Sequence, residues 1–119
     1  MLMKTTLAAS AVVMAMTLAA PAVQANDEGE IKYRQALMKS VGGHMGAIVG
    51  ILKGTTANAA NLQVHTDGMA SLAGTASSAF PAGSDFGETT VMPDVWEKPD
   101  EFAAAMKKFQ DAATGMAAA

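Results

Sequence analysis

The sequence of 119 residues has no cysteine. Disulfide bridges, thiolate metal sites and thioether-linked cofactors are therefore excluded within these residues. Basic residues are also few, with eight Lys and Arg against eleven Asp and Glu, and they form no basic stripe. This balance argues against binding to nucleic acid or to an anionic membrane surface.

The sequence also lacks any recognisable catalytic set. It shows no Ser-His-Asp arrangement, no pair of carboxylates at catalytic spacing and no phosphate-binding loop. The two histidines, His44 and His65, lie on different predicted segments without a third ligand at a helpful spacing, so we expect both at the surface. Nothing here supports an enzyme.

Residues 1–25 have the layout of a secretory signal peptide. A short basic start precedes an apolar run over about residues 7–20, Pro21 breaks that run, and small residues stand before a cleavage point after Ala25. The run has about 14 residues, fewer than the roughly 20 that a membrane-spanning helix needs. We therefore expect a cleaved signal peptide and one helical bundle domain over residues 26–119.

Two helical segments are predicted in the first half of the domain. Acidic residues open the first, at about Glu30, where they suit the positive end of a helix, and Gly54 is a natural stop. Its apolar repeat consists of Ile31, Met38, Val41, Met45, Ile48 and Leu52. Thr56 or Asn58 is expected to cap the second segment. Its predicted buried stripe consists of Leu62, Met69, Leu72, Ala76 and Phe80.

A loop and a third helix follow. Residues 81–93 are rich in Gly, Ser, Thr and Asp, which predicts a long crossing loop. Pro93-Asp-Val-Trp96 predicts a short helical turn, and Pro99 suits the first turn of the third helix. Phe86 and Trp96 are expected to pack. The predicted buried stripe of the third helix consists of Phe102, Met106, Phe109, Ala113 and Met116.

Three amphipathic helices need a fourth to close a core. The last segment runs to Ala119 without a Gly, a Pro or a polar cap. We therefore expect about three helices of a four-helix bundle, with a further helix beyond the given sequence. The three alone would expose an apolar trough and would be only marginally stable.

Particular stretches resemble one family. In the first helix these are Ile31-Lys-Tyr-Arg-Gln-Ala-Leu-Met-Lys39, Gly43-His-Met-Gly46 and Leu52-Lys-Gly54. They are similar to the first helix of the class II c-type cytochromes, which include cytochrome c′ and its cytochrome c-556 relatives. Pro93-Asp-Val-Trp96 is similar to that family's Pro-Glu-Ile-Trp stretch, and residues 102–110 fit its third helix.

The resemblance implies an all-α fold, an antiparallel four-helix bundle of the cytochrome c′ type in the periplasm, holding one haem c. The family attaches its haem through Cys-x-x-Cys-His on the fourth helix, which also supplies the proximal histidine. This sequence has no such motif, and its last histidine is His65. The resemblance therefore implies that the haem-attachment helix is missing after Ala119, so that this polypeptide should not attach haem covalently.

The resemblance also implies four cofactor-binding residues. Arg34 and Gln35 match a pair beside the haem propionates, where a guanidinium suits a carboxylate, although both would also fit a solvated outer face. Met38 matches the position that faces the iron, as an axial ligand or as a packing residue. Thr89 matches the loop that borders the haem.

The leading hypothesis is a periplasmic haem c protein that transfers single electrons to redox partner proteins, with a homodimer as in relatives. The alternative within haem chemistry is a five-coordinate cytochrome c′ that binds NO or CO. Another alternative is a haem-free periplasmic helical module that binds a protein partner or a metal. A noncovalent haem protein would need a histidine on the last helix, and residues 99–119 contain none. None of these inserts into a membrane after signal cleavage.

Overall fold

The computed structural model describes residues 26–119, so the predicted signal peptide and its cleavage point lie outside the described residues. In that part of the chain every regular element is a helix. The elements are α1 (Asp27–Leu52), η1 (Ala59–Asn61), α2 (Leu62–Ala76), η2 (Ser77–Ala79), α3 (Asp94–Glu97) and α4 (Pro99–Ala118), where η marks a 3-10 turn. No helix over this range is long and apolar enough to cross a membrane.

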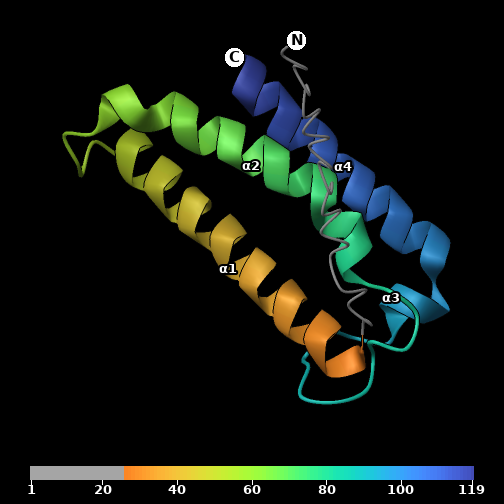
Figure 1. Ribbon diagram of the computed structural model, residues 1–119. Helices are drawn as coiled ribbons and strands as arrows, with labels where there is room; N and C mark the ends of the chain where they lie inside the picture. Colours follow the sequence, from red (N-terminus) through yellow and green to blue (C-terminus); the bar gives the residue numbers. More distant parts are fainter. Residues whose placement is uncertain (1–25) are drawn as a thin grey trace, which may run out of the picture.

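Helix α2 lies at the centre of the arrangement (Figure 1). It packs against α1 on one side and against α4 on the other, whereas α1 and α4 scarcely touch each other. One buried cluster joins the three helices through Ile48, Met69, Ala73 and Ala113. A second cluster joins Leu37 of α1 to Ala76 and Ala79. The predicted all-α fold of the four-helix-bundle type, with about three long helices in this chain, is confirmed.

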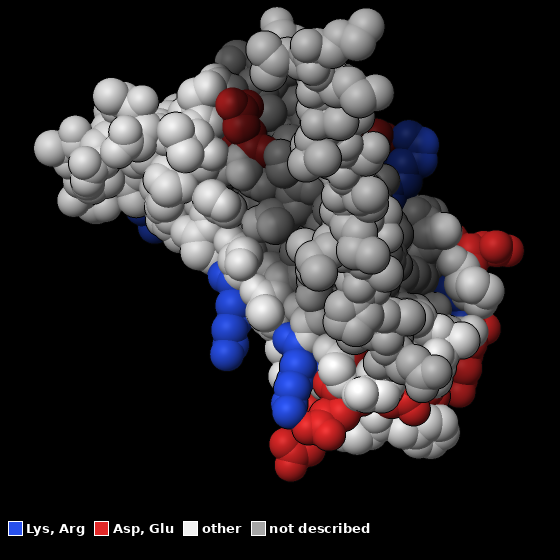
Figure 2. Space-filling view, viewed as in Figure 1, with Lys and Arg blue, Asp and Glu red and all other residues white. Residues whose placement is uncertain are grey.

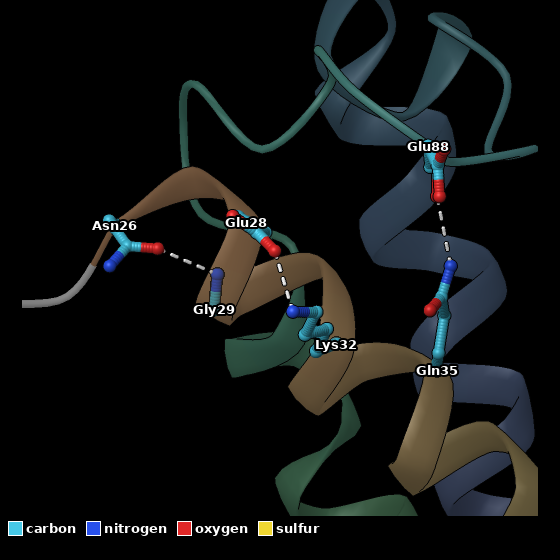
Figure 3. A network of polar contacts seen from close by, with 6 residues as sticks. All are labelled: Asn26, Glu28, Gly29, Lys32, Gln35 and Glu88. Carbon is cyan, nitrogen blue, oxygen red and sulfur yellow. Dashed lines mark hydrogen bonds and ion pairs between the residues drawn. The ribbon is translucent and has the colours of Figure 1, made fainter.

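The helix ends follow from local chemistry. The Asn26 side chain accepts a hydrogen bond of 2.8 Å from the backbone N–H of Gly29 and so caps α1, whose first turn carries three acidic residues (Figure 3). Gly54, at φ 69°, lies directly after the last turn of α1, where the left-handed conformation suits glycine. Pro99 is the first residue of α4. The predicted stop and start are confirmed.

The predicted side-chain cap of the second helical segment is not formed, although Asn58 stands directly before that segment. Asn58 precedes η1 and its backbone carbonyl accepts from the Asn61 N–H, but neither the Thr56 nor the Asn58 side chain caps a helix; the Asn58 side-chain amide instead donates to the Thr56 hydroxyl at 2.7 Å. A 3-10 turn, η1, then stands between this pair and α2. The two polar side chains stabilise the α1–α2 turn and not the first turn of α2.

The predicted apolar repeat of α1 divides into two stripes. Leu37, Val41, His44 and Ile48 face α2 and are buried or half-buried. Met38, Met45, Val49 and Leu52 are exposed. At 100° per residue, the centres of these two stripes lie about 80° apart around the helix. Only the first stripe meets α2, so the apolar repeat predicted for this helix does not form a single buried seam in the described structure.

Candidate cofactor-binding site

Arg34, the only arginine of the chain, is buried at the start of α1 with 2% of its surface exposed. Its Nη1 donates to the Ala79 carbonyl at 3.2 Å and to the Ser84 hydroxyl at 2.9 Å. Its Nη2 donates to the Ser84 carbonyl and to the Thr89 hydroxyl, both at 3.0 Å. One guanidinium therefore fastens the 79–89 segment to α1. The alternative of a solvated outer-face residue is excluded for Arg34.

Aromatic rings and burial set the electrostatics of this guanidinium. Its carbon lies 5.1 Å from the centre of the Phe80 ring and 5.7 Å from that of Trp96, within the range of cation–π attraction. Among residues 26–119, no carboxylate forms an ion pair with Arg34. Burial lowers the pKa of Arg34 from its ordinary value, because the charged form is removed from water. The site thus contains a buried positive charge without an anionic partner in this part of the chain.

The loop after η2 closes over the first turns of α1. Gly87 has φ 119°, a conformation that residues with a side chain rarely adopt. A Cβ there would also lie only 3.2 Å from the Ile31 side chain, so both the backbone conformation and the close contact favour glycine. Ser84 has no exposed surface, and its hydroxyl donates to the Pro81 carbonyl at 2.8 Å. The predicted crossing loop is confirmed, but Ser84 was not predicted as part of the site, because nothing in its local sequence indicates burial.

Gln35 follows Arg34 in α1 and bonds to a different residue of the same loop. Its Nε2 donates to the Glu88 carbonyl at 3.0 Å, and the side chain itself is exposed (Figure 3). A groove of about 530 Å³ runs along this edge, lined among others by Glu28, Lys32 and Phe86. The Lys32 ammonium donates a hydrogen bond to the Glu28 carboxylate, and this bond and charge lower the pKa of Glu28. The hydrogen bonds of Gln35 and Arg34 thus attach the loop to α1 at two points.

Met38 begins the exposed stripe of α1, one turn beyond Arg34. Its side chain is 47% exposed, and Met45, Val49 and Leu52 continue the same face. Residues 40–52 contain no Asp, Glu, Lys or Arg. In Figure 2 most charged side chains gather near the start of α1 and the loop, and the far end of α1 is largely white. The stripe is an open apolar wall with a thioether at one end.

Phe86 and Trp96, the two aromatic residues that were expected to pack, differ in burial. Trp96 of α3 is half-buried, and its indole N–H is shared between the Phe80 carbonyl at 3.2 Å and the Pro81 carbonyl at 3.1 Å. Phe86 is 74% exposed, so its prediction as a packing residue is wrong for the described residues.

Of the four predicted cofactor-binding residues, Arg34 and Thr89 are in direct contact, Gln35 binds the residue before Thr89, and Met38 lies on the adjoining turn of α1. A soft sulfur donor, an apolar wall and a cation suited to a carboxylate together match a flat apolar ligand that carries iron and acid groups. These residues fit one wall of a haem site. The 119 residues hold no cysteine for attachment.

The geometry defines a helical bundle with one open apolar wall. The sequence model of the family described as Cytochrome C′ matches residues 29–119, and the chain belongs to that family. Membership in a cytochrome family implies a haem cofactor.

Two relatives support this assignment. The chain is 35% identical over 81 residues to a cytochrome c-556 from Agrobacterium fabrum (strain C58), covering 67% of this chain and 55% of that protein. It is 36% identical over 77 residues to a cytochrome c-556 from Agrobacterium tumefaciens (strain II Chrys), covering 62% and 61%. The chain therefore spans between half and two thirds of the length of these relatives. No solved structure gives a significant match to it.

Proposed function

We propose that this chain belongs to a periplasmic cytochrome c of class II that carries single electrons on a haem c. The observation that carries the proposal is the exposed Met38 thioether at the head of the apolar stripe of α1. Haem, when bound, supplies the one-electron redox chemistry, and the protein sets its ligand, surroundings and charge. The function does not require turnover of a substrate, so we assign no enzymatic activity.

Each site residue has a role in this proposal. Met38 presents a soft sulfur that suits iron and raises the reduction potential. The uncharged stripe beyond it keeps water from that side of the cofactor. Arg34 supplies a positive charge for propionate groups, and Gln35 and Thr89 hold the loop beside it. Among residues 26–119 Arg34 has no carboxylate partner, which supports this assignment, because buried charges in proteins are usually paired.

The covalent attachment would come from polypeptide outside these 119 residues. Two observations support this part of the proposal: the sequence contains no cysteine, and it spans only 55% and 61% of the two cytochrome c-556 relatives. The predicted signal peptide supports the periplasmic location. Redox proteins are the proposed partners, and a homodimer through α1 and α2 is the proposed assembly.

In the complete protein carrying haem, Met38→Leu is expected to remove the sulfur that would bind the iron. Leucine keeps the volume and apolar character of the side chain but has no sulfur lone pair. The low-spin spectrum should become high-spin, the methionine-to-iron charge-transfer band should vanish, and the reduction potential should fall. Met45→Leu is the matched control, because Met45 lies two turns along the same stripe with similar exposure, 43% against 47%.

The control should keep the low-spin spectrum and the charge-transfer band. If Met38→Leu behaves like Met45→Leu, Met38 is not the ligand and the assignment fails. Absorbance and redox titration of the three proteins measure both properties.

A second candidate function is binding of a small gas at an open sixth position. Gly42, one turn after Met38, borders open space, with nothing within 4 Å of where a Cβ would stand. Gly42 therefore places no side chain in the way of a diatomic ligand beside Met38. A wild-type protein that is already high-spin, and whose spectrum shifts with carbon monoxide, would support the gas binder against the electron carrier.

A further inference from the structure

A pair of histidines lies where α1 meets α2, away from the residues of the proposed haem site. His44 of α1 and His65 of α2 have their Nδ1 atoms 3.1 Å apart and their ring centres 5.4 Å apart. Both rings are half-buried, so the expectation that both lie at the surface is wrong for the described structure. We propose that these two imidazoles form a binding site for a divalent transition-metal ion such as Zn²⁺, separate from the proposed haem site.

The distance between the two nitrogens suits a shared metal. Two imidazole nitrogens bound to one zinc ion at about 2.0–2.1 Å, with an angle of about 90–110° at the metal, lie about 2.8–3.4 Å apart. The observed 3.1 Å falls within that range. Neutral imidazole is a preferred ligand of Zn²⁺, Cu²⁺ and Ni²⁺. With the ring centres 5.4 Å apart, the two nitrogens point almost straight at each other, so each ring would turn by about 40° to bind one ion through both Nδ1 atoms.

The sequence of α2 makes room for this pair. A Cβ on Gly68 would lie 2.6 Å from both Cε1 and Nε2 of His44, closer than atoms can approach. The missing side chain of Gly68 is therefore what lets the His44 ring lie against α2 and reach His65. Glycine inside a helix lowers helix stability, so a packing role for this one has a physical basis.

Small polar side chains lie close to one of the two rings. His65 lines a hollow of about 340 Å³ together with Thr56, Asn58 and Asn61. No group of three or more His, Asp or Glu side chains suited to a metal occurs among residues 26–119, so water or amide oxygen would complete the shell. The site is accordingly a two-histidine site with open positions and moderate affinity, and not a closed structural zinc site.

The test is titration of the full chain with Zn²⁺ alone near neutral pH, followed by ¹⁵N NMR of the imidazole rings. The chain contains only two histidines, so the spectrum of His65→Ala assigns the signals of both rings. We expect both Nδ1 signals to shift together and to saturate at one equivalent, with the ring protons on Nε2. Shift of one ring only, or of neither, would overturn the proposal and leave an imidazole–imidazole hydrogen bond.

Two kinds of variant remove the site by different routes. His65→Ala deletes a ligand, and Gly68→Ala keeps both ligands but displaces the His44 ring. Each should weaken Zn²⁺ binding by about tenfold or more, since even loss of a group that only orients a ligand costs about 10–100-fold. Gly74→Ala is the matched control, because it lies on the same helix with nothing within 4 Å of its Cβ position.

Gly74→Ala should bind Zn²⁺ like the wild type. Circular dichroism should show full helix content in Gly68→Ala, which separates loss of the site from loss of the fold. Wild-type affinity in both Gly68→Ala and His65→Ala would refute the two-histidine site.

Discussion

Arg34→Ala is expected to lower the free energy of unfolding by about 3 kcal/mol, because it leaves several buried acceptors of the 79–89 segment without a donor. The four hydrogen bonds of the guanidinium end on Ala79, Ser84 and Thr89. Ala79 and Ser84 have no exposed surface, so bulk water does not reach these acceptors in the folded wild-type chain. A loss of this size is a large part of the roughly 5–15 kcal/mol that stabilises a typical domain.

Arg34→Lys separates charge from geometry. Lysine keeps the positive charge, but a single ammonium group cannot span the acceptors that the planar guanidinium reaches on two sides. We expect a smaller but clear loss of stability in this variant. Urea unfolding of the chain, followed by circular dichroism, measures both effects.

Lys39→Ala is the control for these variants, since Lys39 is an exposed basic residue of the same helix. Its effect should stay within about 0.5 kcal/mol. Equal stability of Arg34→Ala and Lys39→Ala would mean that the loop is held by its own turns and not by the guanidinium.

Met69→Ala should cost about 2–5 kcal/mol, the range for truncation of a buried methionine. Met69 is 1% exposed and packs in the cluster that joins Ile48 of α1 to Ala113 of α4. Because α1 and α4 scarcely touch directly, a cavity at this position weakens both interfaces of α2 at once. The same urea titration should show the midpoint moving to lower denaturant with a similar slope.

Met92→Ala is the matched control for the core truncation. It removes the same atoms from a side chain that is 67% exposed, so its effect should be within about 0.5 kcal/mol. If the two methionine variants unfold at the same urea concentration, the described cluster does not hold the three helices together.

The sequence predicts the helices better than their packing. Gly54 and Pro99 mark helix ends because backbone conformation at these residues is decided locally. The rotation of α1 is different, since Leu37 and Met38 are both apolar and either one could face α2. Only the partner helix decides between them, and it buries Leu37 and leaves Met38 exposed.

The candidate site was less predictable from the sequence than the helices were. Family resemblance indicates Arg34, Gln35, Met38 and Thr89, and the structure brings these four residues to one end of α1. The acceptors of Arg34, however, lie 45 to 55 positions further along the chain, and no local pattern predicts such bonds. The contact between His44 and His65 escaped prediction for the same reason, because it depends on the space left by Gly68.

The open face of α1 couples folding to whatever occupies it. An occupant that binds only the folded chain adds about 1.4 kcal/mol for each tenfold excess over its dissociation constant. A loaded molecule would therefore unfold less often and survive protease longer than an empty one. On this account the thermal midpoint is itself a gauge of occupancy, and cells that degrade unstable chains would selectively retain those that have received their ligand.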